Sequence, residues 1–386
     1  MTEKRVERLL RKPERPREIS FLELFFDLAI IFSLTQLTRR LLEDFSADNS
    51  VQTLILLAAV WWIWVAASRT ADWLNPHEPA LQWIISVLMF VGLLAAAAVP
   101  RAFDGHGLVF ASAYVLSHVG RHLAIMYVLR GHPLQTRSAR AAIWFAGGGV
   151  PWLVGAFLPA PWRLVCWSVA IVVDYVGAGL GWPVPGLGNV REHLRVTGDH
   201  IAERHRQVFI VGLGELILAS GIAYSQSRLD WGRTLAFAIT FANAVLMLWI
   251  YFLPRDVDLA RTLNSRPPHV AIFASYAHGL MIAGIVVTAM GDEVLIGHPL
   301  GEPRAAWPAA VIAGAFVYLA GRTVYALIVF RQPAWRAPGG MLVLAAAAPG
   351  LLALPTLAVA VVVNLVLFAV VLAYRRIRRR ARLRVS

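Results

Sequence analysis

The sequence predicts an all-α membrane protein, a polytopic bundle of about twelve transmembrane helices built as two parallel six-helix repeats. The chain of 386 residues is 58% hydrophobic and only 15% charged, whereas soluble domains carry about 25% charged residues. Its apolar residues fall into runs of the roughly 20 residues that a helix needs to cross a bilayer. The basic residues behind the net charge of +13 gather at the two ends and in alternate connections, which is typical of membrane topology rather than of a nucleic-acid-binding face.

Taken in order, the apolar runs predict twelve spans separated by polar connections. The eleventh is the weakest because it is short and Pro349-Gly350 interrupts it. The expected spans are residues 20–41, 51–68, 81–100, 108–129, 138–158, 162–182, 206–225, 233–253, 269–290, 305–330, 339–353 and 355–374.

The distribution of Lys and Arg predicts the orientation of these spans. With the N-terminus in the cytoplasm, the inner segments hold 27 of the 36 basic residues and the outer segments hold seven. The remaining two, Arg121 and Arg322, lie inside spans. Because cytoplasmic connections are enriched in Lys and Arg, we expect both termini in the cytoplasm and an even number of spans.

Short similarities between the halves predict an internal repeat. Gly120-Arg121 and Gly321-Arg322 fall at equivalent places in the fourth and tenth spans, and Asp27 corresponds to Glu215. Six is an even number, so the two units would run the same way through the membrane, as parallel repeats do. The expected segments are a basic cytoplasmic N-terminus at 1–19, a first repeat at 20–182, a cytoplasmic linker at 183–205, a second repeat at 206–374 and a basic cytoplasmic tail at 375–386.

Two carboxylates in the first span, Glu23 and Asp27, are the leading candidates for function. They are four residues apart, so they lie on one face of a helix. An ionisable residue inside a span costs roughly 2.5–3.5 kcal/mol on insertion scales and usually faces the bundle interior with a partner. The pair would either bind a cation or relay protons through a shared proton, or form a buried ion pair with an arginine that fixes helix register.

The remaining candidates for an ion or solute pathway are ionisable residues in other spans or at their ends. Arg121 and Arg322 require counter-charges, for which Asp27, Asp174 and Glu215 are the expected partners. His200, Glu203 and Arg204 precede the seventh span and form either a solvated cap at the interface or a cytoplasmic gate. His278 in the ninth span is either a packing residue or a proton relay.

Several motifs occur in order along nearly the whole chain, namely Leu22-Glu23-Leu24-Phe25-Phe26-Asp27-Leu28, Pro100-Arg101-Ala102-Phe103, Gly120-Arg121, His200-Ile201-Ala202-Glu203-Arg204, Leu213-Gly214-Glu215 and Tyr276-Ala277-His278. Together they resemble the bacterial low temperature requirement A (LtrA) family. The resemblance implies an integral membrane protein of the bacterial plasma membrane, named for a growth phenotype in the cold, and implies no particular substrate. A single aromatic-x-Asp match at Phe25-Phe26-Asp27 is also similar to the first-span signature of a potassium-channel family.

These features favour a transporter- or channel-like protein that moves a small solute or ion across the bilayer, with proton coupling as one version. The alternative is a membrane sensor or assembly protein whose buried charges are structural. The chain has no phosphate-binding loop and no nucleophile motif, so we expect no enzyme activity, no cofactor, no metal and no nucleic-acid partner.

Overall fold

In the residues that the computed structural model describes, the regular secondary structure is helical, apart from an isolated bridge between Leu10 and Leu74. This confirms the all-α class. Most of the predicted N-terminal segment, residues 188–197 of the predicted linker and the end of the tail lie outside the described residues. Those residues are 8–10, 20–187, 198–253, 259–301, 304–331 and 335–382.

The chain divides into two compact units, which are described separately. Unit 1 comprises Met1–Arg40, Ser46–Arg204 and Leu263–Phe273, and unit 2 comprises Leu41–Phe45, His205–Thr262 and Ala274–Ser386. The repeat relation between residues 20–182 and 206–374 stays a prediction.

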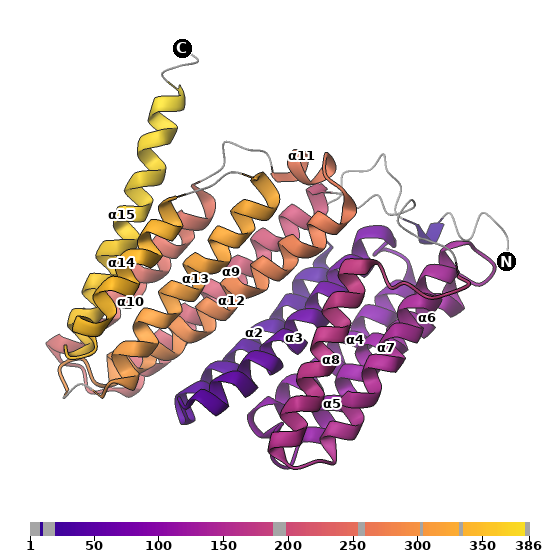
Figure 1. The fold of residues 1–386 in the computed structure, drawn as a ribbon, viewed down its shortest axis with the longest axis horizontal. Coiled ribbons are helices and arrows are strands. Elements are labelled where there is room, and N and C mark those ends of the chain that lie inside the picture. Colours follow the sequence, from indigo (N-terminus) through magenta and orange to yellow (C-terminus); the bar gives the residue numbers. More distant parts are fainter. Residues whose placement is uncertain are drawn as a thin grey trace. The chain divides into compact units, whose positions relative to one another are not determined.

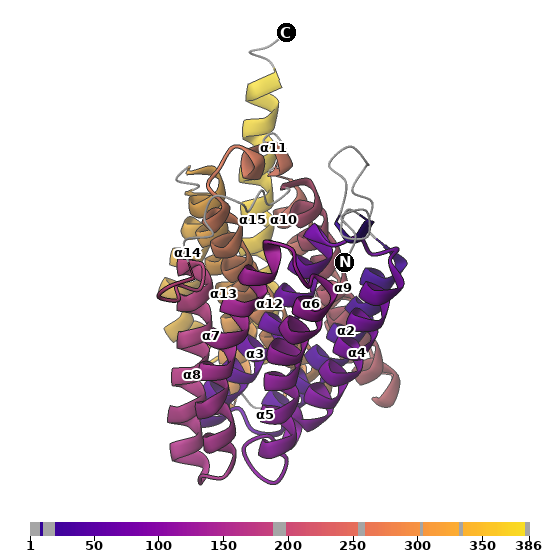
Figure 2. The ribbon, with the colours of Figure 1, turned by 90° about the vertical axis from the view of Figure 1, so that its right-hand side faces the viewer.

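Unit 1 is a bundle of long helices in which α7 packs against α8, α4 against α5, and α3 against both α4 and α8. Figures 1 and 2 show α7 and α8 side by side. A π-helical turn, η2, interrupts the fourth predicted span, and such turns are frequent at functional sites. The helices are α2 (Phe21–Glu43), α3 (Ala47–Trp73), α4 (Pro79–Ala98), η1 (Val99–Arg101), α5 (Gly107–Val115), η2 (Leu116–Gly120), α6 (Arg121–Val128), α7 (Leu134–Ala156), α8 (Ala160–Leu180) and the first turns of α9 (Gly198–Gln226).

Unit 2 is a second bundle, in which α10 packs against α15 and α13 packs against α14 and α15. It takes the rest of α9. Its other helices are α10 (Trp231–Phe252), α11 (Leu259–Asn264), which it shares with unit 1, most of α12 (Pro268–Gly297), α13 (Ala306–Phe330), α14 (Arg336–Leu351) and α15 (Thr356–Arg382).

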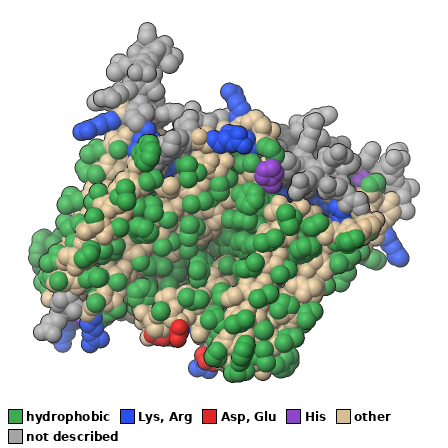
Figure 3. Space-filling model, viewed as in Figure 1, with side chains coloured by type: hydrophobic (Ala, Val, Ile, Leu, Met, Phe, Trp, Pro, Cys, Tyr) green, Lys and Arg blue, Asp and Glu red, His purple; other side chains and the backbone are tan. Residues whose placement is uncertain are grey.

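Ten helices in the described part of the chain are long and apolar enough to cross a bilayer, when η1 is counted with α4 and η2 and α6 are counted with α5. The helices α7 and α14 are not among these ten. The 16 residues of α14 span about 24 Å at ~1.5 Å per residue, less than the ~30 Å hydrocarbon core. Figure 3 shows hydrophobic side chains covering the helices and charged side chains near their ends. The protein is a multi-pass membrane protein, and the count of twelve spans stays a prediction.

Within unit 2, α12 and α13 approach each other closely at glycine residues. A Cβ added at Gly284 would meet the backbone nitrogen of Tyr318 and would lie 2.6 Å from its Cα. A Cβ added at Gly321 would lie 2.6 Å from the backbone nitrogen of Met281. Small residues allow membrane helices to pack with their backbones in contact, so these glycines set the distance between α12 and α13.

Replacing Gly284 with Ala should destabilise the protein by about 1–3 kcal/mol, because the new methyl group overlaps the backbone of α13. Alanine is otherwise favoured over glycine within a helix by about 0.5–1 kcal/mol. Gly339→Ala in α14 is the matched control, since no heavy atom lies within 4 Å of its added Cβ. Thermal unfolding in detergent should therefore show a lower midpoint for Gly284→Ala and an unchanged or higher one for Gly339→Ala. Equal midpoints would contradict close packing of α12 on α13.

Candidate functional site

Glu23, in the first turn of α2, caps the N-terminus of that helix. Glu23 Oε2 accepts hydrogen bonds from the backbone N–H and the hydroxyl of Ser20, both at 3.0 Å. The Ser20 hydroxyl accepts the backbone N–H of Glu23 at 3.3 Å in return. This reciprocal arrangement is a capping box. One carboxylate oxygen thus serves the helix terminus, and Oε1 stays available for a partner on another helix.

Asp27, one turn further along α2, forms an ion pair with Arg204 of α9. Arg204 donates from Nη1 to Oδ2 at 2.8 Å and from Nη2 to Oδ1 at 2.7 Å, the two-pronged geometry in which arginine binds carboxylates most strongly. Trp64 of α3 donates its indole N–H to the same Oδ1 at 2.9 Å. Arg204 also donates from Nε to the hydroxyl of Ser68 at 2.9 Å. Asp27 is therefore held from two neighbouring helices.

His200, one turn before Arg204, lies between two carboxylates. Its Nε2 is 2.8 Å from Glu23 Oε1, and its Nδ1 is 3.5 Å from Asp72 Oδ1. A neutral imidazole carries one N–H and one lone pair, so it can donate to only one of these two acids. On the line Glu23–His200–Asp72, the Glu23 contact is within hydrogen-bond distance, whereas Nδ1 lies near Asp72 without a hydrogen bond. We call Glu23, Asp27, Asp72, His200 and Arg204 the ionic cluster.

The ionic cluster is sealed from solvent within unit 1. Its members are exposed by 0% at His200, 1% at Asp27, 2% at Arg204, 3% at Glu23 and 7% at Asp72. Both paired contacts span 177 positions of the chain, so α2 and α9 run in the same direction where they meet. Buried ion pairs of this kind contribute little net stability but are costly to break.

Comparison with known proteins places this chain in a family. The family model described as bacterial low temperature requirement A protein (LtrA) matches residues 18–372. The chain belongs to the LtrA family. An uncharacterised protein of Rhizobium meliloti (strain 1021), RA0937, is 34% identical over 309 residues, which cover 78% of this chain and 75% of that protein. No solved structure matches.

The expected partners of the two arginines within spans were wrong for this LtrA-family chain. Arg121 donates from Nη1 to the carbonyl of Ala66 at 2.9 Å and to the hydroxyl of Thr70 at 2.7 Å, and no carboxylate of the described residues pairs with it. Arg322 lies over the Tyr325 ring at 6.0 Å and donates to the Ile250 carbonyl at 3.5 Å. Backbone carbonyls and a hydroxyl take the place of the predicted acids.

The proposed solvated cap ahead of the seventh span is also corrected. His200 and Arg204 are buried and belong to the ionic cluster, because α9 begins at Gly198 and carries them into the interior of unit 1. Glu203, on another face of α9, is only half-buried. Glu23 and Asp27 do not contact each other to share a proton as expected; Glu23 meets His200 and Asp27 meets Arg204 instead.

Asp174 forms a second buried contact in unit 1. The hydroxyl of Tyr114 on α5 donates to Asp174 Oδ2 at 2.7 Å. Its Oδ1 lies against Gly148 of α7, where an added Cβ would come within 2.7 Å. Asp174 is 1% exposed and is separate from the ionic cluster, so unit 1 holds two buried acidic sites rather than one.

The remaining predicted residues lie in unit 2. Glu215 is 1% exposed and His278 is fully buried. The His278 ring stacks on His205 at 4.6 Å, and His205 Nε2 is 3.1 Å from the hydroxyl of Ser275. The structure thus places His278 in an aromatic layer, and its predicted role in a pathway stays a prediction.

The sequence-based prediction missed Asp72, which belongs to the ionic cluster, and Trp64 and Ser68, which form hydrogen bonds to its members. A signal for the pairing was present, because His200 and Arg204 are four residues apart, as are Glu23 and Asp27. Two helices with ionisable residues at the same spacing can align both pairs at once. The sequence gives no such signal for Trp64 or Ser68, whose contribution depends on how α3 is rotated. Among the described residues, no group of three or more His, Cys, Asp or Glu side chains is arranged to hold a metal ion.

Proposed function

We propose that this LtrA-family protein is a transporter- or channel-like membrane protein for a small solute or ion, with proton coupling through the ionic cluster. The observation that supports this is a sealed set of three carboxylates, one imidazole and one guanidinium inside helices of a membrane protein. Apolar residues of similar volume would often give equal or greater stability. Intramembrane ionisable residues are therefore interpreted first as functional.

The cluster supplies the parts of a proton-sensitive switch. His200 can exchange a proton with Glu23, and a small approach of Asp72 to Nδ1 would extend the exchange to Asp72. A proton on Asp27 would remove the negative charge that holds Arg204 with two hydrogen bonds. The loss of that attraction changes which partners Arg204 and Trp64 prefer, and such local changes of charge can bias a bistable helix pair.

The proposal is tested by flux in proteoliposomes loaded with a pH-sensitive dye. Purified full-length protein is exposed to a broad panel of cations, anions and small solutes, with and without a proton gradient. We expect a flux that Asp27→Asn abolishes or uncouples from protons. Asp104→Asn is the matched control, because Asp104 is an exposed residue in a connection. Absence of any flux across the panel would count decisively against transport.

The alternative proposal is a membrane sensor or assembly protein in which the cluster only holds helices together. It is favoured by the sealing of the cluster and by the occupation of both Asp27 oxygens by Arg204. The exchanged variant Asp27→Arg with Arg204→Asp separates the two proposals. Recovery of folded yield and of growth in the cold, without any flux in either protein, would favour the structural role. Recovery of folding with loss of a wild-type flux would favour transport.

We place the protein in the bacterial plasma membrane with both termini in the cytoplasm, on the strength of the basic ends and connections. The partners in this proposal are the lipid bilayer and a small solute or ion. No enzymatic step, cofactor or nucleic acid is part of it.

A further inference from the structure

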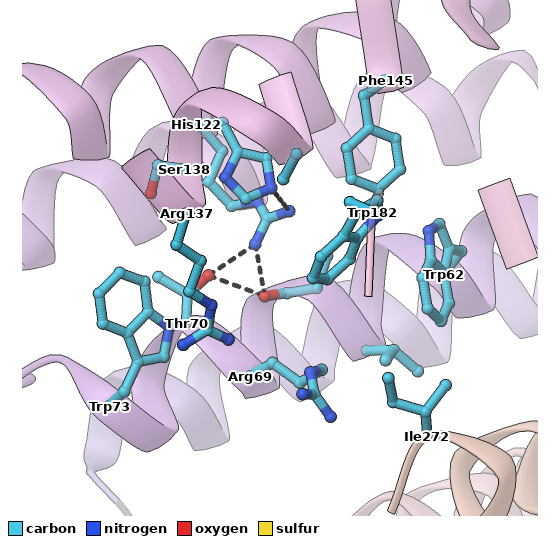
Figure 4. Close-up of a pocket in the computed structure, with 14 residues that line it drawn as sticks. Trp62, Arg69, Thr70, Trp73, His122, Arg137, Ser138, Phe145, Trp182 and Ile272 are labelled. Carbon is cyan, nitrogen blue, oxygen red and sulfur yellow. Dashed lines mark hydrogen bonds between the residues drawn. The ribbon is translucent and has the colours of Figure 1, made fainter. Parts of the chain in front are cut away.

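A second polar site in unit 1 gathers three arginines around one small pocket. Figure 4 shows Arg69 and Thr70 of α3 and Arg137 of α7 at this pocket, with His122 of α6 opposite. Arg121, at the start of α6, completes the arginine set. The π-helical turn that precedes α6 ends at Gly120, so this irregular turn leads directly into Arg121 and His122.

Two of the three guanidinium groups, those of Arg121 and Arg137, lie close to other positive charges. Arg137 is attracted by Asp72 and repelled by both Arg69 and Arg121. Asp72 is itself shared, since it lies 3.5 Å from His200. Neither Arg121 nor Arg137 forms an ion pair with a described residue. Like charges repel strongly in a poorly solvated interior, so the pocket holds an excess of positive charge that an anion would relieve.

Hydrogen-bond donors at the pocket are also incompletely used. Arg121 is 8% exposed, and its Nε has no hydrogen-bond partner, although Nη1 and Nη2 are engaged. His122 is 7% exposed, and its Nδ1 lacks a partner as well. The guanidinium of Arg137 lies over the Trp73 ring at 4.9 Å, which fixes the position of the group at the pocket. Buried donors without acceptors are rare unless a ligand or water completes them.

The size of the pocket limits the ligand. The cavity measures ≈ 30 Å³, and about 10–15 Å³ accommodates one water molecule. A compact group of atoms fits and a bulky one does not. Planar guanidinium groups match oxyanions such as phosphate and carboxylate better than spherical anions.

We propose that the pocket between α3, α6 and α7 binds a compact oxyanion through Arg69, Arg121 and Arg137. The inference deepens the proposed function and rests on it in one respect, because it names the class of solute. The oxyanion is either free in solution or the phosphate of an anionic lipid headgroup. With the orientation expected from the basic residues, the pocket lies toward the cytoplasmic side.

The test is anion-dependent stability of the purified full-length protein. The unfolding midpoint is measured in a neutral detergent against rising inorganic phosphate at constant ionic strength, with sodium chloride as the balancing salt. A ligand that binds the folded state raises stability as its concentration exceeds Kd. We expect a saturable rise for the wild type. For Arg137→Gln we expect the apparent Kd to increase at least about tenfold, because a charge-assisted hydrogen bond is lost.

The variants separate a ligand site from a merely structural role. If Arg137 is part of a ligand site, Arg137→Gln should be at least as stable as the wild type without phosphate, because a like-charge repulsion is removed. Arg69→Gln should behave in the same way. Arg130→Gln is the matched control, since Arg130 is exposed and lies outside the pocket. It should retain the wild-type response.

A second arm identifies the source of the oxyanion. Nanodiscs of phosphatidylcholine are compared with nanodiscs containing phosphatidylglycerol, both without free phosphate. Stabilisation of the wild type but not of Arg137→Gln by phosphatidylglycerol supports a headgroup site, and stabilisation by free phosphate supports a solute site. If neither arm distinguishes the wild type from Arg137→Gln, the inference is overturned. A phosphate site in a protein without flux would contradict transport alone, whereas flux that survives without any phosphate site would contradict the oxyanion pocket alone.

Discussion

Replacing Arg204 with Met is expected to destabilise the protein by about 3–5 kcal/mol, the usual cost of removing one partner of a buried ion pair. The substitution leaves the Asp27 carboxylate 1% exposed with no cation at either oxygen. It also removes the donor to Ser68. The unfolding midpoint in detergent and the yield of monodisperse protein should both fall sharply.

Two further variants show whether the cost comes from the uncompensated charge. Arg130→Gln removes an exposed arginine and should change stability by less than about 0.5 kcal/mol. The double variant Asp27→Leu with Arg204→Met should recover most of the loss, because apolar pairs of similar volume often replace buried ion pairs without penalty. The indole N–H of Trp64 would still lose its acceptor. Equal losses in the single and double variants would contradict the ion pair as the cause.

Replacing Glu23 with Ala should be nearly as damaging, with an expected loss of about 3–5 kcal/mol. The substitution removes the acceptor for both Ser20 donors, and loss of such a cap costs about 0.5–2 kcal/mol by itself. It also removes the 2.8 Å contact with His200. The single substitution Glu23→Ala therefore weakens both the start of α2 and the ionic cluster.

Glu23→Gln distinguishes these two roles. The amide oxygen can still accept from Ser20, so the start of α2 should be preserved while the charge beside His200 is lost. We expect stability between those of the wild type and Glu23→Ala, measured by thermal unfolding of the three proteins side by side. A Glu23→Gln protein as unstable as Glu23→Ala would show that the charge, and not the cap, carries the contribution of Glu23.

The ionic cluster and the arginine pocket are joined through one helix. Within unit 1, α3 supplies Trp64, Ser68 and Asp72 to the first site and Arg69 and Thr70 to the second. Asp72 faces His200 on one side and attracts Arg137 on the other. If both proposals hold, a proton moving on the Glu23–His200–Asp72 line alters the charge next to the oxyanion pocket. This arrangement is a physical route by which proton and anion movements would be linked.

The sequence by itself determined the membrane class and the approximate positions of the helices. Hydrophobic runs and the scarcity of charge are local properties, and they predict helical spans without reference to the fold. The spacing of Glu23 and Asp27 placed both carboxylates on one face of α2 in the same way. Motifs such as Leu213-Gly214-Glu215 indicated the family, and the family model matches residues 18–372.

Only the tertiary structure decided which cation meets which acid. Asp27 pairs with Arg204, 177 positions away, and not with Arg121, which binds the carbonyl of Ala66. Contacts between helices depend on the rotation of each helix about its axis and on the packing of its neighbours. The residue spacing within a single helix specifies neither of these. The arginine pocket also depends on tertiary packing, because α3, α6 and α7 bring Arg69, Arg121 and Arg137 together. The π-helical turn that precedes α6 was not predicted by the residue spacing.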